Sequence, residues 1–377
     1  MTEATLWDVP AHGILWESDV RLGAMVQAVE NVIRSRDPIL GADVRKFERE
    51  FARYCKRPSA LGLNSGTDAL VIALRALDIG PGDEVITTAT TFTATASAIV
   101  RVGAIPVFVD ISRDTWTLDP IAVEEAITDR TRAVLPVHLY GCPADMEALA
   151  RICVSHGFAL IADAAQAVGS RYKGMPIGHF GDIAAFSFFP TKNLAAFGDA
   201  GAIVSSDRGV MLKAMNLREH GISEGETVRI GYNSRLDSIQ AAVLVARLNW
   251  LEEENRRRRD IARQYSGALA EFGITTPTAP SNAEHSFYQY AVEVPIGRDH
   301  LLAFLHQQGI EAKAYYELPL YRHAAYLGRS RTHGSMEVTD LHARVTLCLP
   351  CHAGMSDDQQ DRVVEALRAW QIEPHNS

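Results

Sequence analysis

The chain has 377 residues, of which 47% are apolar and 22% are charged, so it can bury a large core in one large domain with a smaller one, or in two similar domains. It carries 37 basic and 46 acidic residues, a formal charge of −9, which argues against nucleic acid as the main partner. The sequence shows no signal peptide, no apolar stretch of membrane-spanning length and no disulfide framework among its five cysteines, which predicts a cytoplasmic protein without membrane contacts.

Between residues 43 and 206, apolar helical patterns alternate with short apolar runs. A helix is expected over Gly66–Leu77, because leucines recur on one face before Gly80-Pro-Gly stops the pattern. The expected strands are nearly continuous in apolar residues, which is typical of strands covered on both faces: Glu84–Thr88, Ile105–Asp110, Ala133–His138, Phe158–Asp163, Ile183–Phe188 and Ala202–Ser206. This alternation predicts an α/β domain with a mostly parallel sheet, whose ligands bind at the carboxyl ends of the strands.

The C-terminal part of the chain has a different pattern. A helical pattern without proline runs from about Leu236 to Leu269 and predicts one long connecting helix. After Gly273 the pattern predicts the elements of a smaller α+β domain, followed by a polar loop: Tyr288–Val294, Asp299–Gln308, Glu311–Tyr316 and the loop Gly328–Gly334.

Two local patterns favour structural interpretations. Glu252–Glu254 precedes Arg256–Arg259 at a spacing of four, which predicts a solvent-exposed helix face that neutralises its own charge. Cys348 and Cys351 form a C-x-x-C pair without a second pair, so we favour a strand end with buried thiols over a metal or redox site, and no metal is expected.

Lys192 is one of only six lysines and lies just past the expected strand Ile183–Phe188. A lysine at a strand exit beside the tight turn Gly198-Asp-Ala-Gly is a candidate for imine formation with a carbonyl, although most loop lysines are surface residues. Asp163 ends another apolar strand. Its buried charge requires a partner such as a pyridinium nitrogen, unless it caps the following helix.

Asn64-Ser-Gly-Thr-Asp opens the expected first helix with small residues. Backbone N–H groups and the positive end of the helix dipole make such a turn a phosphate-binding site, with Gly66 permitting close approach and Thr67 adding a hydroxyl, although most such turns are only well-capped helix starts. Together, the three segments would hold one cofactor at its phosphate, ring nitrogen and aldehyde.

These residues resemble the DegT/DnrJ/StrS family of nucleotide-sugar aminotransferases, which are fold-type I pyridoxal-phosphate (PLP) enzymes. The resemblance covers nearly the whole chain and rests on an ordered set of motifs: Pro38-Ile-Leu-Gly with Phe47-Glu-Arg-Glu-Phe, Asn64-Ser-Gly-Thr-Asp-Ala-Leu, Gly82-Asp-Glu-Val-Ile with Thr91-Phe92, Asp163-Ala-Ala-Gln-Ala-Val-Gly, Ser187-Phe-Phe-Pro-Thr-Lys-Asn-Leu, Gly198-Asp-Ala-Gly and Gly231-Tyr-Asn-Ser-Arg-Leu-Asp. It implies a mostly parallel, seven-stranded-type sheet between helices in residues 1–245, which include an N-terminal arm. A connecting helix and a small α+β domain are implied for residues 246–377.

The resemblance also implies residue roles. Lys192 would be the Schiff-base lysine and proton carrier, and Asp163 would pair with the pyridine nitrogen. The other implied cofactor contacts are Gly66, Thr67 and Ser187 to the phosphate, Phe92 stacked on the ring, Gln166 at the ring hydroxyl and Asn233 reaching the phosphate of a partner subunit. The active site would therefore be shared between the two subunits of a homodimer.

The substrate end departs from the family pattern at Tyr316 and Glu317, where relatives often carry a histidine-and-proline motif. Tyr316 is a candidate substrate contact, and Arg235, Arg322 and His323 are candidates for binding a diphosphate or, equally, structural ion-pair members. The expected reaction is amination of a dTDP-4-keto-6-deoxyhexose by L-glutamate. A 3-keto-deoxyhexose, a keto-cyclitol and a non-catalytic PLP-binding regulator are the alternatives.

Overall fold

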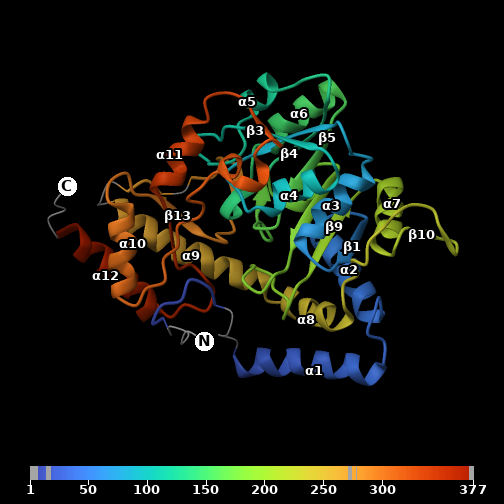
Figure 1. Ribbon diagram of the computed structural model, residues 1–377. Coiled ribbons are helices and arrows are strands. Elements are labelled where there is room, and N and C mark those ends of the chain that lie inside the picture. Colours follow the sequence, from blue (N-terminus) through green and yellow to red (C-terminus); the bar gives the residue numbers. More distant parts are fainter. Residues whose placement is uncertain (1–6, 14–17, 271–273, 277, 373–377) are drawn as a thin grey trace.

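A computed structural model describes residues 7–13, 18–270, 274–276 and 278–372. Its centre is an eight-stranded sheet (Figure 1) in which only β9 runs antiparallel to its neighbours. In spatial order the strands are β1 (Ser59–Leu63), β9 (Gly201–Ser205), β8 (Ile183–Ser187), β5 (Ala159–Asp163), β4 (Thr131–Leu135), β2 (Glu84–Thr88), β3 (Ile105–Val109) and β14 (Arg331–Thr332). All six expected strands are present, so the predicted α/β sheet is confirmed.

Helices cover both faces of this sheet (Figure 1). One face is covered by α3 (Gly66–Ala76), α4 (Ala94–Arg101) and α7 (Arg208–Arg218). The other is covered by α2 (Ala42–Tyr54), α5 (Pro120–Glu125), α6 (Met146–His156) and α8 (Ser238–Leu248). Because both faces are buried, the central strands are mostly apolar.

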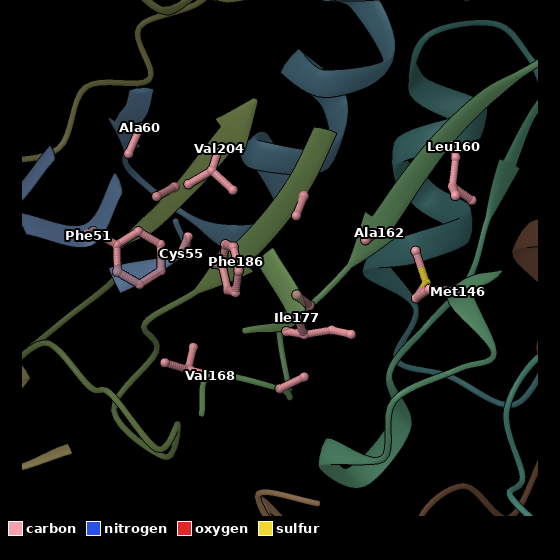
Figure 2. Packing of buried hydrophobic residues seen from close by; sticks show 14 of the residues in the cluster. Phe51, Cys55, Ala60, Met146, Leu160, Ala162, Val168, Ile177, Phe186 and Val204 are labelled. Carbon is pink, nitrogen blue, oxygen red and sulfur yellow. The ribbon is translucent and has the colours of Figure 1, made fainter. Parts of the chain in front are cut away.

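The second of these faces fixes the strand that leads to Lys192. Figure 2 shows Phe51 of α2 packed against Phe186 of β8, and the two rings meet edge to face with centroids 5.0 Å apart. Phe51 also packs edge to face on Phe188, at 5.2 Å. These fully buried aromatic pairs hold the end of β8, so the residues that follow it leave the sheet from a rigid point.

The expected long helix Leu236–Leu269 is wrong in one respect, because the structure contains two helices, α8 and α9 (Leu251–Leu269). At the junction, the N–H of Trp250 bonds to the carbonyl of Arg247, three residues back, and the Trp250 backbone has φ −104° and ψ −10°. No proline or glycine marks this break, since Asn249 and Trp250 separate the helices through backbone geometry alone.

The C-terminal part of the chain has its own core, which includes Val9 from the N-terminal segment. Its regular elements are β13 (Tyr290–Glu293) paired with β15 (Thr346–Leu349), and α10 (Arg298–Gln307), α11 (Glu337–Val345) and α12 (Asp357–Ile372). The division of the chain at residue 245 stays a prediction. The short β14 lies in the expected loop Gly328–Gly334 and adds an eighth strand to the large sheet, because Arg331 pairs with the buried Glu84.

Two further expectations for this region need correction. Residues 311–316, all of which the structure describes, form only the single bridge Lys313–Cys348 in place of a strand. The charge run is not simply an exposed face, because Glu254 and Arg258 are buried. Glu254 pairs with Arg21 at 3.1 Å, and Arg258 donates to the Cys351 carbonyl at 2.6 Å.

The remaining elements are short or peripheral. Helix α1 (Asp19–Ser35) packs on α8 at the edge of the molecule (Figure 1). The short elements are β6 (Arg171–Tyr172), β7 (Met175–Pro176) and β12 (Ala283–Glu284), the hairpin β10 (Ile222–Ser223) and β11 (Glu226–Thr227), and the 3-10 turns Leu139–Gly141, Ile177–His179, Leu320–Arg322 and Ala324–Tyr326. Among the described residues, no helix is both long and apolar enough to cross a membrane.

Candidate active site

The expected cofactor residues gather at the carboxyl ends of neighbouring strands. Asp163 is the last residue of β5 and lies opposite Ala185 of the adjacent strand β8. Ser187 ends β8, and Lys192 follows five residues later in the loop that leads to β9. Because these strands are neighbours, Asp163 and Lys192 lie at one edge of the sheet, where open α/β sheets bind ligands.

Asp163 is almost fully buried, with 5% of its surface exposed. Its carboxylate accepts hydrogen bonds from the Thr95 hydroxyl at 2.8 Å and from the Ala165 N–H at 3.1 Å. Burial raises the pKa of Asp163, and these hydrogen bonds and the positive charge of Lys192 offset only part of that effect. No described Lys, Arg or His forms an ion pair with this carboxylate, so a buried acid is available for a cationic partner, as a pyridinium N–H would be.

The turn before α3 forms a close cradle against the end of β8. Ser65 caps the helix by accepting a hydrogen bond from the Asp68 N–H at 3.1 Å. A Cβ atom added to Gly66 would lie 2.5 Å from the Cβ of Ser187, so only glycine permits this approach. The half-buried Thr67 is the next residue, and first-turn N–H groups lack intrahelical carbonyl partners. Together, Gly66, Thr67 and Ser187 fit an anion such as a phosphate.

Lys192 is half-buried, and its ammonium lies 4.1 Å from the centroid of the Tyr288 ring, a cation–π distance. The Tyr288 hydroxyl lies 3.1 Å from that of Thr191, which fixes the ring beside the lysine. The His12 ring lies roughly parallel to Tyr288, with centroids 6.2 Å apart, and burial lowers the pKa of His12 to about 4.

Gln166 and Tyr316 are brought together by the fold. The Gln166 side-chain amide donates to the Tyr316 hydroxyl at 3.1 Å, and its oxygen accepts from the Tyr140 N–H at 2.7 Å. Phe92 is 56% exposed in the segment between β2 and α4, just before the helix that supplies Thr95, so its ring is free to cover a bound aromatic group.

The four remaining expected residues are exposed or half-buried. Asn233 is exposed, but its neighbour Ser234 donates to the side-chain oxygen of Asn64 at 2.9 Å and so joins this segment to the phosphate turn. Arg235 is half-buried. Arg322 forms an exposed ion pair with Asp340 at 2.5 Å.

The His323 ring nitrogen lies 3.1 Å from the Leu318 carbonyl. This part of the chain lies against the segment that carries Phe92, because the Leu320 N–H bonds to the Ala89 carbonyl at 3.1 Å. The structure gives none of these four residues, Asn233, Arg235, Arg322 and His323, a contact with Lys192.

Sequence reasoning missed Thr95, Tyr140 and Tyr288. Thr95 had a usable signal, since hydroxyl-rich residues that follow a buried parallel strand lie at the ligand edge of the sheet. Tyr288 and Tyr140 had none, because each reaches the site through contacts with residues more than 20 positions away in sequence. In the described part of the chain, no group of three or more His, Cys, Asp or Glu residues is arranged to hold a metal ion.

Comparison with known proteins supplies the family. The profile of the DegT/DnrJ/EryC1/StrS aminotransferase family matches residues 23–368. A "Pleiotropic regulatory protein" of Geobacillus stearothermophilus is 42% identical over 91% of this chain and 93% of its own. The dTDP-3-amino-3,4,6-trideoxy-alpha-D-glucose transaminase of Streptomyces venezuelae is 43% identical, over 91% of each chain. The UDP-N-acetyl-3-dehydro-alpha-D-glucosamine 3-aminotransferase of Acidithiobacillus ferrooxidans is 40% identical over 97% of this chain and 98% of its own.

Solved structures agree with these relatives. The structure of S. venezuelae DesV in complex with a ketimine intermediate has a TM-score of 0.93 and 41% identity, over 97% of this chain and 99% of its own. The structure of NtdA from Bacillus subtilis with bound cofactor PMP has a TM-score of 0.91 and 28% identity, over 99% and 87%. The chain therefore belongs to the DegT/DnrJ/EryC1/StrS aminotransferase family and is a PLP-dependent aminotransferase of fold type I.

Proposed function

We propose that the chain transfers an amino group from L-glutamate to a nucleotide-linked keto sugar in aminosugar biosynthesis. The observation that carries this proposal is the buried carboxylate of Asp163, which has no ion-pair partner among the described residues yet lies close enough to Lys192 to feel its charge. A buried acid beside a reactive amine suits a cofactor that has both a basic ring nitrogen and an aldehyde.

The residues of the chain would divide the work as follows. Gly66, Thr67 and Ser187 would hold the phosphate, Asp163 would keep a proton on the ring nitrogen, Phe92 would cover the ring, and Gln166 would contact its hydroxyl. Bound PLP would supply an electron sink that stabilises negative charge at the carbon next to nitrogen. The free amine of Lys192 would then act as general base and acid. It would take the proton from the carbon of the amino donor and deliver it to the cofactor.

We also propose which carbon of the sugar receives the amino group. The sequence favoured a 4-keto acceptor, whereas the two sugar transaminases that are 43% and 40% identical both have names that state position 3. We therefore propose a 3-keto nucleotide sugar as the first acceptor to test and a dTDP-4-keto-6-deoxyhexose as the second. The nucleotide is left open between dTDP and UDP, because these two relatives differ in it.

Two other functions have specific predictions. A keto-cyclitol acceptor carries no diphosphate, so replacing Arg322 should leave its turnover unchanged but weaken the binding of a nucleotide sugar. A non-catalytic regulator is suggested by the name of the relative that is 42% identical, but such a role would not need Lys192 beside a buried Asp163.

We also propose a homodimer with shared active sites. Large apolar side chains are exposed on α1, near the β10–β11 hairpin and beside the cofactor residues, and such surfaces favour burial in an interface: Val20, Leu22, Val26, Ile33, Ile222, Val228, Ile230, Phe92, Phe189 and Phe197. The exposed Asn233 lies next to that hairpin and would reach the partner's phosphate. The cytoplasmic location stays a prediction.

The deciding experiment is a screen of dTDP- and UDP-linked 3-keto and 4-keto sugars with L-glutamate, in which NMR locates the new amine. A product aminated at carbon 3 supports the proposal, and amination only at carbon 4 restores the first expectation. Turnover of a free keto-cyclitol, with none of any nucleotide sugar, would contradict both.

A further inference from the structure

Tyr140 contacts three segments that carry site residues. Its backbone N–H donates to Gln166 at 2.7 Å, and its backbone carbonyl accepts from the Gln289 N–H at 3.2 Å, next to Tyr288. Its hydroxyl donates to the carbonyl of Tyr315, the neighbour of Tyr316. One residue of the β4–α6 connection therefore contacts Gln166, expected at the cofactor ring, and the sequence neighbours of Tyr288 and Tyr316.

The backbone of Tyr140 is held in an unfavourable conformation. Its φ is 59°, in the left-handed region that residues other than glycine, asparagine and aspartate rarely adopt, and only 2% of its surface is exposed. Such strain persists only where the surroundings fix it, and it concentrates at functional sites. In this conformation, the Tyr140 N–H and hydroxyl both make the contacts given above, with Gln166 and with Tyr315.

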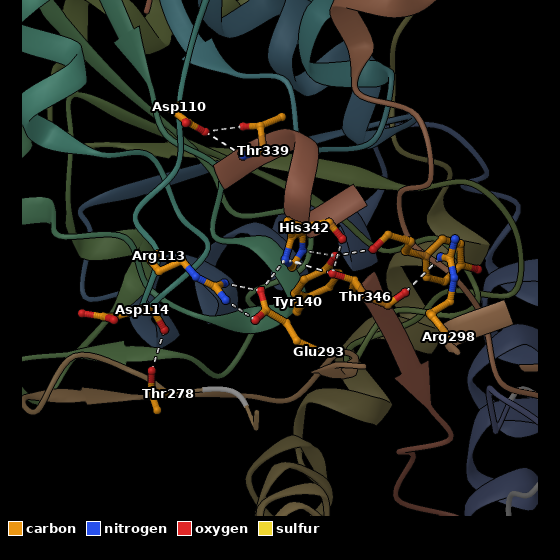
Figure 3. A network of polar contacts seen from close by, with 11 residues as sticks. Asp110, Arg113, Asp114, Tyr140, Thr278, Glu293, Arg298, Thr339, His342 and Thr346 are labelled. Atoms are coloured by element: carbon orange, nitrogen blue, oxygen red, sulfur yellow. Dashed lines mark hydrogen bonds and ion pairs between the residues drawn. The ribbon is translucent and has the colours of Figure 1, made fainter. Parts of the chain in front are cut away.

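The Tyr140 hydroxyl is itself oriented by the C-terminal part of the chain (Figure 3). It lies 3.1 Å from Nε2 of the fully buried His342, whose Nδ1 lies 2.9 Å from the Thr346 hydroxyl. Burial raises the pKa of Tyr140 and lowers that of His342, and the Glu293 carboxylate, 3.7 Å from Nδ1 of His342, opposes the second effect. The Tyr140 O–H bonds to the Tyr315 carbonyl, and the Thr346 hydroxyl donates to the His342 backbone carbonyl at 2.6 Å. Each hydroxyl proton therefore has its acceptor, and Nε2 of His342 can donate to the Tyr140 oxygen.

We propose that Tyr140 is a positioning residue that holds the Tyr315–Tyr316 segment against Gln166, with His342 orienting its hydroxyl. If Tyr140 has this role, losing its hydroxyl should weaken sugar binding, a consequence that rests on the proposed function. It should also make the Tyr315–Tyr316 segment more mobile, which does not depend on that function. Tyr316 meets Gln166 from the C-terminal part of the chain, so fixing its neighbour sets the distance between the substrate side and the ring side of the site.

The test compares Tyr140→Phe with Tyr265→Phe. Both substitutions remove one buried hydroxyl that bonds to a backbone carbonyl, since Tyr265 donates to Pro350 at 3.0 Å, and both keep the ring. In Tyr140→Phe, hydrogen–deuterium exchange should become about fivefold faster at the amides of Lys313 and Leu320, the size expected for one lost hydrogen bond. Lys313 and Leu320 flank the Tyr315–Tyr316 segment that loses its contact with the hydroxyl. The Gln289 amide bonds to the backbone carbonyl of residue 140 instead and should keep its rate, and Tyr265→Phe should leave all three rates unchanged.

Steady-state kinetics with the accepted sugar form the second arm. Tyr140→Phe should raise the KM for the sugar about fivefold while kcat, the KM for glutamate and cofactor retention stay within about twofold. His342→Gln should have a smaller effect, and the double variant should match Tyr140→Phe, because both changes act through one contact. Additive effects in the double variant would overturn the role of His342.

The two proposals fail in different ways. If the wild-type enzyme aminates no nucleotide sugar, the proposed function fails, and the exchange rates still test Tyr140. If the wild type is active but Tyr140→Phe and Tyr265→Phe behave alike in exchange and kinetics, the positioning role is overturned and the function stands.

Discussion

The Thr95 hydroxyl, in the first turn of α4, donates a 2.8 Å hydrogen bond to Oδ2 of Asp163 at the end of β5. This bond orients the carboxylate but brings no positive charge to it. The buried, unpaired carboxylate of Asp163 therefore lowers the stability of the cofactor-free protein, and a bound cationic group would offset this cost.

The first prediction follows from this arrangement. Because burial raises the pKa of Asp163 above its unfolded value, the folded apoprotein binds more protons, and its stability falls as pH rises from the unfolded pKa through the folded one. Asp163→Asn should therefore stabilise the apoprotein at neutral pH, and the gain should vanish at a pH below both values. The same variant should bind PLP about 10–100-fold more weakly, since a charge-assisted hydrogen bond is lost.

Thermal unfolding of both apoproteins across pH, with equilibrium dialysis of PLP, measures these effects. A neutral-pH destabilisation by Asp163→Asn together with unchanged PLP affinity would show that the carboxylate serves the fold instead of the cofactor.

The second prediction concerns Lys192. Lys192→Ala should lower kcat by about 10³-fold or more, because both the covalent attachment and the proton carrier are lost. Folding should be unaffected, because the side chain is only half-buried and forms no ion pair with another described residue. Borohydride reduction of the wild-type holoenzyme should label the peptide that contains Lys192, while Lys213→Ala serves as a control with full activity. Label on another lysine would overturn the assignment.

The third prediction uses two glycines. Gly66→Ala should destabilise the protein by about 1–3 kcal/mol and weaken PLP binding, because its Cβ would meet Ser187 at 2.5 Å. Gly23→Ala is the matched control, since it lies in α1 with nothing within 4 Å of an added Cβ. It should be neutral or stabilising by up to about 1 kcal/mol. Equal unfolding midpoints for the two variants would contradict the close approach.

The fourth prediction tests the shared site. Asn233→Ala should weaken cofactor retention, and mixed dimers of Asn233→Ala with Lys192→Ala should recover part of the activity that each homodimer lacks. One of the two sites in such a heterodimer would have both native residues. Activity no higher than the sum of the separate variants would show that Asn233 acts within its own subunit, or not at all.

The sequence by itself determined the elements that local pattern controls. Continuous apolar runs specified the strands of the large sheet, and small residues before an amphipathic run specified the start of α3 at Gly66. Because parallel strands bring their carboxyl ends to one edge, Asp163 and Lys192 could be assigned to one site before any distance was known.

Only the tertiary structure decided what those residues touch. Thr95 on Asp163, Tyr288 under the Lys192 ammonium and Tyr140 between Gln166 and Tyr315 each depend on contacts between segments distant in sequence. The added strand β14 also depends on such a contact, because Arg331 reaches the buried Glu84. A short sequence pattern reflects the conformational preferences of its own residues. Which partner a side chain contacts depends on how the whole chain packs, and a short pattern does not contain that information.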